Sequence, residues 1–103
     1  MHLHRTAISD AGLAHLVKLQ GLEELSLASP RLGDAGMVYL KELKSLQELS
    51  LAGTAVSDAG LLHLQGLARL HEVDLSNTRV SEAGLVHLRQ ALPGAFIYRT
   101  PEK

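Results

Sequence analysis

Hydrophobic residues recur along the chain in a pattern that repeats every 24 residues. Residues 46–69 show one unit in full, LQELSLAGTAVSDAGLLHLQGLAR, which opens with apolar positions spaced LxxLxL. The last two of these positions are two residues apart, and side chains two apart lie on the same face of a β-strand. Each unit is therefore predicted to begin with a short strand that buries one face. The apolar positions are Leu22, Leu25 and Leu27, then Leu46, Leu49 and Leu51, then Leu70, Val73 and Leu75.

The second half of each unit carries apolar residues at a spacing of three, which is helical rather than strand-like. Ser9, Ser57 and Ser81 precede this run, and each is followed by Asp or Glu. Serine is a good helix N-cap, and a carboxylate in the first turn suits the helix dipole. A helix is predicted to start at each of these places, with Gly33 as the odd member. Its apolar positions are Leu13, Leu16 and Leu19, then Met37, Leu40 and Leu43, then Leu61, Leu64 and Leu67, then Leu85, Leu88 and Ala91.

Two further residue types return at fixed places in the unit. Glycine occupies positions 12, 36, 60 and 84, although glycine inside a helix costs about 1 kcal/mol relative to alanine. Its return predicts a close approach between adjacent units. Thr54 and Thr78 share one turn position, where a buried hydroxyl is expected to bond the loop backbone. Pro30 has no hydroxyl and should interrupt this series in the second unit.

A fixed period of this size indicates a solenoid, in which each unit buries its apolar face against its neighbours. The 24-residue step aligns Met1 with Leu25, so the first unit is expected to begin inside its strand. In the tail, Ile97 falls where Val73 lies, and the charged Arg99 takes the next core position, which predicts a short last strand. We expect a single domain over 1–103, with a truncated repeat at 1–21, repeats at 22–45, 46–69 and 70–93, and a closing segment at 94–103.

The motif LxxLxLxxTxVSDAGLxxLxxL resembles leucine-rich repeats. It is most similar to the 24-residue variety common in bacterial repeat proteins, which is related to the cysteine-containing repeats of F-box proteins but here lacks cysteine. The resemblance implies an α/β open solenoid of about four repeats plus a C-terminal closing segment, with short parallel strands on the concave face and helices on the convex face. It also implies a non-catalytic protein–protein interaction module that uses the concave sheet face and the C-terminal edge.

Composition and charge exclude several classes of function. The net charge is −1 with scattered lysines and arginines, which gives no electrostatic support for a nucleic-acid or membrane partner. No apolar run is long enough to span a membrane and no secretory signal opens the chain, so a cytoplasmic location is expected. The chain has no cysteine and lacks motifs such as GxSxG and HExxH, so neither an enzyme nor a cofactor is predicted. His2 and His4 share a strand face, but two ligands make a weak metal site, and none is expected.

The strand residues that face away from the core carry the candidate site. Glu24, Glu48 and Glu72 fall at one position of successive strands, where like charges destabilise a sheet. This acidic stripe marks either a site for a basic or polar partner surface or a solvated face kept charged against edge association. Two aromatic residues of the tail lie beside it, as binding anchors or as a cap over the last core layer. The predicted partner-binding residues are Glu24, Glu48, Glu72, Asp74, Phe96 and Tyr98.

Other functions stay open beside a concave binding face. Ala14, Val38, Leu62 and Val86 form an apolar line on the outer side of the helices, either a docking surface or ordinary exposed aliphatic residues. The chain is alternatively a structural or self-assembling segment of a larger protein, with its uncapped N-terminal repeat as the interface. A narrower alternative is the substrate-recognition part of an F-box-like ubiquitin-ligase adaptor, although the sequence contains no F-box segment.

Overall fold

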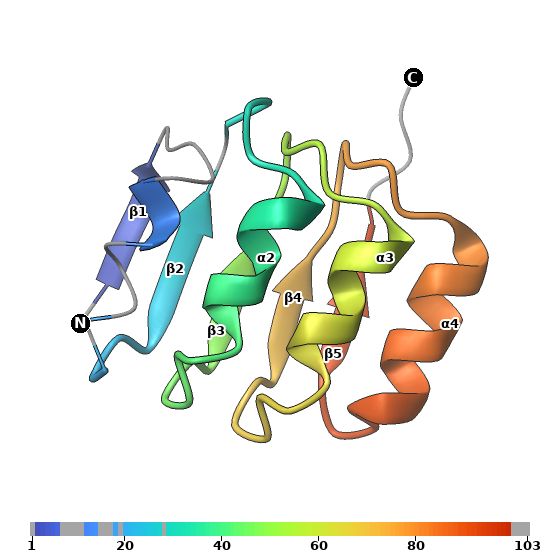
Figure 1. Ribbon diagram of the computed structural model, residues 1–103. Coiled ribbons are helices and arrows are strands. Elements are labelled where there is room, and N and C mark those ends of the chain that lie inside the picture. Colours follow the sequence, from blue (N-terminus) through green and yellow to red (C-terminus); the bar gives the residue numbers. More distant parts are fainter. Residues whose placement is uncertain (1, 7–11, 15–17, 19, 28, 100–103) are drawn as a thin grey trace.

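The computed structural model describes residues 2–6, 12–14, 18, 20–27 and 29–99, with side chains from residue 12 onward. Within these residues, five short strands form one parallel sheet in sequence order, β1-β2-β3-β4-β5 (Figure 1). The strands are β1 (His2–Thr6), β2 (Glu24–Leu27), β3 (Glu48–Ser50), β4 (Glu72–Asp74) and β5 (Phe96–Tyr98).

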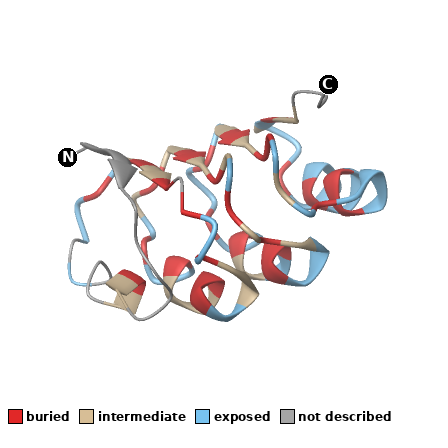
Figure 2. Cartoon of the chain, turned by 90° about the horizontal axis from the view of Figure 1, so that it is seen from above, coloured by how far each residue is buried: buried red, intermediate tan, exposed pale blue. Residues whose placement is uncertain are grey.

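Helices cover one face of this sheet, and the other face carries none of the described helices. A helical segment follows each of the strands β2, β3 and β4, and residues 12–14 are helical as well. Seen from above, strands and helices form two layers with buried residues between them (Figure 2). The predicted α/β solenoid fold is thus confirmed. The helical segments are α2 (Asp34–Leu40), α3 (Asp58–Leu61) with the 3₁₀ helix η1 (Leu62–Leu64), and α4 (Glu82–Ala91).

The core between the two layers is aliphatic. Leu25, Leu49, Val73 and Ile97 lie side by side at equivalent strand positions, and all four are almost fully buried. Burying one such side chain contributes roughly 1.5–3 kcal/mol, so a continuous row of them holds successive units together. The residues that alternate with them in β2, β3 and β4 are only half-buried. The one-sided strand predicted from LxxLxL is confirmed.

Adjacent units approach closely at the recurring glycines. A Cβ atom at Gly60 would lie 2.5 Å from Asp34 Oδ1 and 2.9 Å from Met37 Cγ. At Gly84 the same atom would overlap the Asp58 carboxylate. Any side chain at these two positions would displace side chains of the preceding unit, so the predicted close approach is confirmed for Gly60 and Gly84.

An aspartate–serine link joins the same helices. The Asp34 carboxylate accepts hydrogen bonds from the Ser57 backbone N–H, at 2.8 Å, and from the Ser57 hydroxyl. Asp58 accepts the same pair from Ser81, at 2.8 Å from the N–H and 2.5 Å from the hydroxyl. Each carboxylate therefore binds the N-cap residue of the next helix, 23 residues further along the chain.

This link corrects the predicted role of Ser57. Its side chain makes no capping bond within the described helix α3, and its hydroxyl donates to Asp34 of the preceding unit. Ser81 donates to Asp58 and also caps α4 by accepting from the Gly84 N–H at 3.3 Å. Gly33 begins α2 without a side chain, and Ser9 lies outside the described residues. The helices start where predicted, but capping by serine explains only α4.

The helices are also less uniform than the spacing of three predicts. Leu43 and Leu67 are buried in the core, yet α2 ends at Leu40 and η1 ends at Leu64, so both leucines lie in the following turns. In α4 the helix continues through Ala91, which is exposed, and the next residue, Leu92, enters the core. A true α-helix turns about 100° per residue, so three-residue steps drift off the buried face.

The first repeat differs from its predicted register. The 24-residue step would pair Leu3 with Leu27, but β1 pairs Leu3 with Leu25 and His2 with Glu24, followed by a register shift before Thr6. The expectation that the stack begins inside a strand is therefore wrong, because β1 starts level with β2. As an edge strand, β1 takes its register from one described ladder, so the repeat spacing alone does not fix it.

The tail and the turns follow the prediction. Val73 pairs with Ile97, and β5 is only three residues long. Thr54 and Thr78 donate their hydroxyls to backbone carbonyls three residues earlier, each at 2.7 Å. Pro30 is exposed and cannot donate, and there the neighbouring Ser29 hydroxyl accepts from a backbone N–H instead.

Candidate functional site

The open face of the sheet, hereafter the concave face, aligns the predicted site residues in two rows. Glu24 pairs with Glu48 and Glu48 with Glu72, and this row ends at Phe96. The second row runs from Ser26 through Ser50 to Asp74 and ends at Tyr98. The predicted placing of the two aromatic residues beside Glu72 and Asp74 is therefore confirmed. The two rows are Glu24, Glu48, Glu72 and Phe96, and Ser26, Ser50, Asp74 and Tyr98.

A shallow hollow of about 160 Å³ lies between these rows. Five of the six predicted residues line it, and the described residues around it include no lysine or arginine. Its polar rim is thus dominated by carboxylates, over a floor that includes Leu25 and Leu49. The lining residues are Glu24, Leu25, Ser26, Glu48, Leu49, Ser50, Glu72, Asp74 and Tyr98.

The aromatic pair closes one end of the hollow. The ring centroids of Phe96 and Tyr98 are 5.1 Å apart with planes inclined at 31°, a spacing typical of attractive ring contacts. Phe96 is 67% exposed, so its ring does not shield the last core layer. Burial raises the pKa of the Tyr98 phenol, and the nearby charges of Asp74 and Glu72 raise it further. Tyr98 therefore stays protonated and able to donate a hydrogen bond.

Asp74 is held in place by its own turn. Its Oδ1 accepts the Ser76 backbone N–H at 2.9 Å, as the Ser50 hydroxyl accepts the Ala52 N–H at 3.4 Å in the preceding unit. The carboxylate thus replaces a serine without disturbing the turn, and it adds a negative charge beside Tyr98. Substitution at this one position makes the C-terminal half of the concave face more acidic than the N-terminal half.

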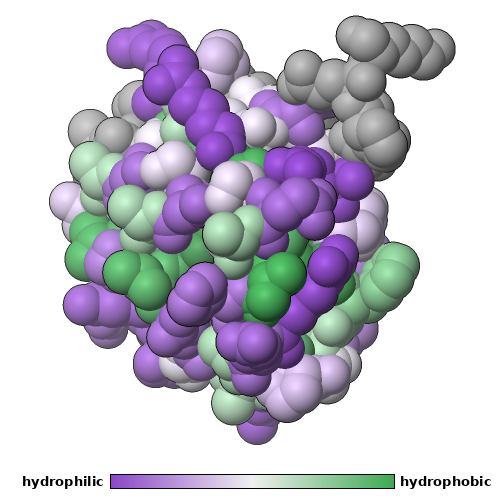
Figure 3. All heavy atoms as spheres, turned by 90° about the vertical axis from the view of Figure 1, so that its right-hand side faces the viewer, coloured by the Kyte–Doolittle hydropathy of each residue, from purple (hydrophilic) through white to green (hydrophobic). Residues whose placement is uncertain are grey.

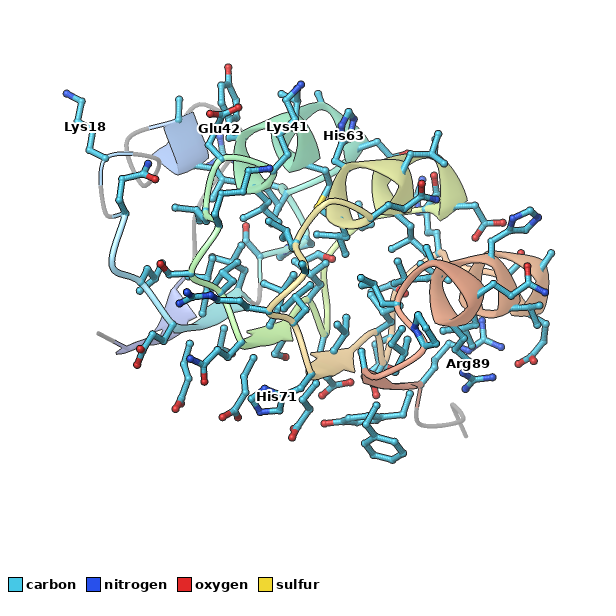
Figure 4. All side chains as sticks on the ribbon, turned by 90° about the horizontal axis from the view of Figure 1, so that it is seen from below. Lys18, Lys41, Glu42, His63, His71 and Arg89 are labelled. Carbon is cyan, nitrogen blue, oxygen red and sulfur yellow. The ribbon has the colours of Figure 1, made fainter. Side chains whose placement is uncertain are left out.

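His71 joins the site without having been predicted. Its Nε2 lies 3.9 Å from Glu48 Oε2, and both side chains are about half exposed. Figure 4 shows His71 on the concave side, away from Lys41 and His63 on the helical side. Equivalent positions in earlier units hold Glu23 and Gln47, so no recurrence marks this residue in the sequence. The contact forms because the His71 side chain extends toward Glu48 on the neighbouring strand.

The convex face matches its predicted apolar line only in part. Leu62 is 64% exposed and Val86 45% exposed, whereas Ala14 and Val38 are half-buried. A groove of about 370 Å³ lies between α3 and α4, and Leu62 is one of the residues that line it. Among the described residues, the exposed part of the line is therefore limited to the third and fourth units. The groove is lined by Asp58, Ala59, Leu61, Leu62, Gln65, Ala83, Gly84, His87 and Leu88.

Some predicted features lie outside what the structure describes. The side chains of His2 and His4 and most of the first repeat, including the proposed N-terminal interface, are among them. Within the described part of the chain, no group of three His, Asp or Glu side chains is placed to hold a metal ion. None of the described helices is both long and apolar enough to cross a membrane.

Comparison with known proteins agrees with this architecture. The family model for the Leucine Rich repeat matches residues 42–64, which run from the turn after α2 through β3 to the end of η1. No curated protein matches the chain. Repeats of this family are typically non-catalytic and generally mediate protein–protein interactions. The same strand, turn and helix recur on both sides of the matched segment, so the chain has the architecture of a leucine-rich-repeat solenoid.

Proposed function

We propose that this chain is a non-catalytic binding module whose concave face and C-terminal edge receive a protein surface rich in lysine or arginine. One observation carries the proposal. The row formed by Glu24, Glu48 and Glu72 borders a single hollow and ends at an exposed phenylalanine.

The acidic row supports a basic partner because its charges are crowded. Residues paired across neighbouring strands lie about 5 Å apart, and like charges at that distance destabilise the sheet. Glu48 is paired with His71 only at the long distance of 3.9 Å. A partner that brings ammonium or guanidinium groups to the row would relieve this repulsion, so binding gains energy that the free protein lacks.

The aromatic end supports recognition of the same kind of partner. A cation over the face of a phenylalanine or tyrosine ring is attracted by the ring quadrupole, by about 0.5–1 kcal/mol at exposed sites. Phe96 and Tyr98 present such rings beside Glu72 and Asp74. Aromatic anchors next to charged groups are also typical of the residues that dominate interface energies. The C-terminal half of the concave face is therefore the expected centre of the interface.

The test compares concave variants with a matched control. A quantitative pull-down with the wild-type chain identifies its partners, and calorimetry then measures the affinity for each of them. We expect the triple variant Glu48→Lys, Glu72→Lys and Tyr98→Ala to retain none of these partners. The control Glu23→Lys and Glu42→Lys alters net charge equally at two exposed glutamates outside the hollow. Glu42 lies on the helical side in Figure 4.

The outcomes separate a concave site from a general charge effect. Partner affinity that falls at least tenfold in the triple variant, and stays near the wild-type value in the control, supports the proposal. Equal losses in both variants would indicate non-specific attraction. Unchanged affinity in a folded triple variant would contradict binding at the concave face.

Self-assembly is the second candidate, because Leu62 is exposed and lines the convex groove. If copies associate through this groove, Leu62→Lys should abolish the association seen by sedimentation. An unchanged sedimenting mass in this variant would contradict association through the groove. Assembly through the N-terminal repeat, an F-box-like adaptor role, a cytoplasmic location and the exclusion of nucleic-acid and membrane partners stay predictions of the sequence.

A further inference from the structure

Each inner unit offers two sets of hydrogen-bond acceptors that the next unit fills. The first is a loop carbonyl, where Leu32 O accepts the Ala55 N–H at 2.8 Å and Val56 O accepts the Arg79 N–H at 2.9 Å. The second is the carboxylate at the start of the helix, which accepts from the next serine. The same acceptors recur in the last unit as Val80 O and the Glu82 side chain.

One arginine fills both acceptors in the last unit. Arg99 donates from Nη1 to Val80 O and from Nη2 to Glu82 Oε1, the latter at 2.8 Å. Its guanidinium thus reaches the two groups that in the inner units bind the backbone and hydroxyl of the following repeat. The planar fork of arginine suits this task because it presents several donors in fixed directions.

A second arginine covers the edge of the sheet. Phe96 N–H donates to His71 O at 2.7 Å and Tyr98 O accepts from Leu75 N–H at 2.9 Å, so both residues face β4. Backbone groups of successive strand residues point to opposite sides, and Ile97 O therefore points to the outer edge of β5. Arg89 of α4 donates to this oxygen from Nε at 3.2 Å and from Nη2 at 3.0 Å.

We propose that Arg89 and Arg99 form an arginine cap that takes the place of a following repeat and prevents another strand, such as one from a second copy of this chain, from pairing with β5. An uncovered edge strand presents unpaired N–H and C=O groups to other chains. Here three acceptors that a stacked unit would use are already bonded within the chain. Figure 3 views this end of the stack, where hydrophilic side chains predominate and hydrophobic ones show in separate places.

The double variant Arg89→Ala and Arg99→Ala tests the cap. Sedimentation velocity over a wide concentration range should show self-association at least about tenfold tighter than for the wild-type chain. The matched control is Arg69→Ala and Arg79→Ala, which removes the same charge from two exposed arginines and should sediment like the wild-type chain. A folded cap variant that sediments like the control would overturn the proposal.

Two further measurements keep the test decisive if the double alanine variant does not fold. Arg89→Lys and Arg99→Lys keep the charges but lose the guanidinium forks, and this variant should associate more than the control. In the wild-type chain, nuclear magnetic resonance should show the Nε–H of Arg89 exchanging with solvent at least about tenfold more slowly than those of Arg69 and Arg79, because it is hydrogen-bonded. Equal exchange rates would contradict the cap directly.

Discussion

The sheet of this molecule follows the 24-residue period more regularly than the helical layer does. From β2 to β5 every strand pairs with the next at a constant 24-residue offset. The helical segments of the same units have seven, four plus three, and ten residues. Backbone hydrogen bonds fix the register of a sheet residue by residue, whereas a helix needs only to bring a few side chains to the core.

Because of this difference, only a surface with regularly spaced side chains can recognise a partner through the intervals between them. The rows of the concave face repeat at the strand spacing, so charges and rings stand at fixed intervals. The convex face varies from unit to unit, and within the described part of the chain its large exposed apolar residues are Leu62 and Val86. Strict repetition of glutamates on the concave face gains no stability, which fits the proposal that this face binds a partner.

The largest expected loss of stability comes from a substitution in the buried row of the sheet. Leu49→Ala removes a side chain that is 2% exposed in the central strand β3. Such truncations cost about 2–5 kcal/mol, since the cavity does not fully collapse. Urea denaturation should show this loss, whereas Leu62→Ala on the convex face should change the free energy of unfolding by less than about 0.5 kcal/mol. Similar losses at both positions would contradict the difference between the layers.

The next effect tests the contact between helical units. Gly84→Ala places a methyl group against the Asp58 carboxylate, and we expect a net loss of about 1–2 kcal/mol despite the better helix propensity of alanine. Gly94→Ala is the control, since a Cβ atom there meets nothing within 4 Å. Adding Asp58→Ala to Gly84→Ala should recover part of the loss, because the clash disappears. Strictly additive losses in this double-mutant cycle would show that the two residues do not interact.

A smaller effect, dependent on pH, is expected from the aspartate–serine link. Hydrogen bonds from the Ser81 hydroxyl and N–H hold the pKa of Asp58 below its ordinary value of 3.8. Asp58→Ala should cost about 1 kcal/mol at neutral pH, as usual for solvent-exposed bonds. Because the folded pKa is the lower one, this stability is present above the unfolded pKa and lost as pH falls through the folded value. Thermal unfolding should therefore show the two proteins converging in acid, and a constant difference would contradict the assignment.

The sequence predicted the features that recur and missed those that depend on one contact. The buried row through Leu49, the pairing of Val73 with Ile97 and the tight glycines all follow from periodicity. The Asp34–Ser57 link was missed because an N-cap explains the same residues, and only the distance between units decides between the two. The arginine cap and His71 occur once each, so no pattern marks them in advance.

The smallest effect concerns the concave face, where stability and binding should move in opposite directions. Glu72→Gln removes one charge from the row that includes Glu48, so the free energy of unfolding should rise by about 0.2–1 kcal/mol. Affinity for a basic partner should fall in the same variant, because the lost charge belongs to the proposed interface. The control Glu42→Gln, on the helical side, should alter neither quantity.

Both measurements are needed to interpret this variant. A stabilised protein with weaker binding would show that the glutamate row is kept for recognition at some cost to the fold. Lower stability would mean that Glu72 makes a favourable contact with its neighbours, such as Tyr98, that outweighs the repulsion. Because the regular spacing of the sheet creates both the repulsion and the proposed site, a single substitution in this row tests the two together.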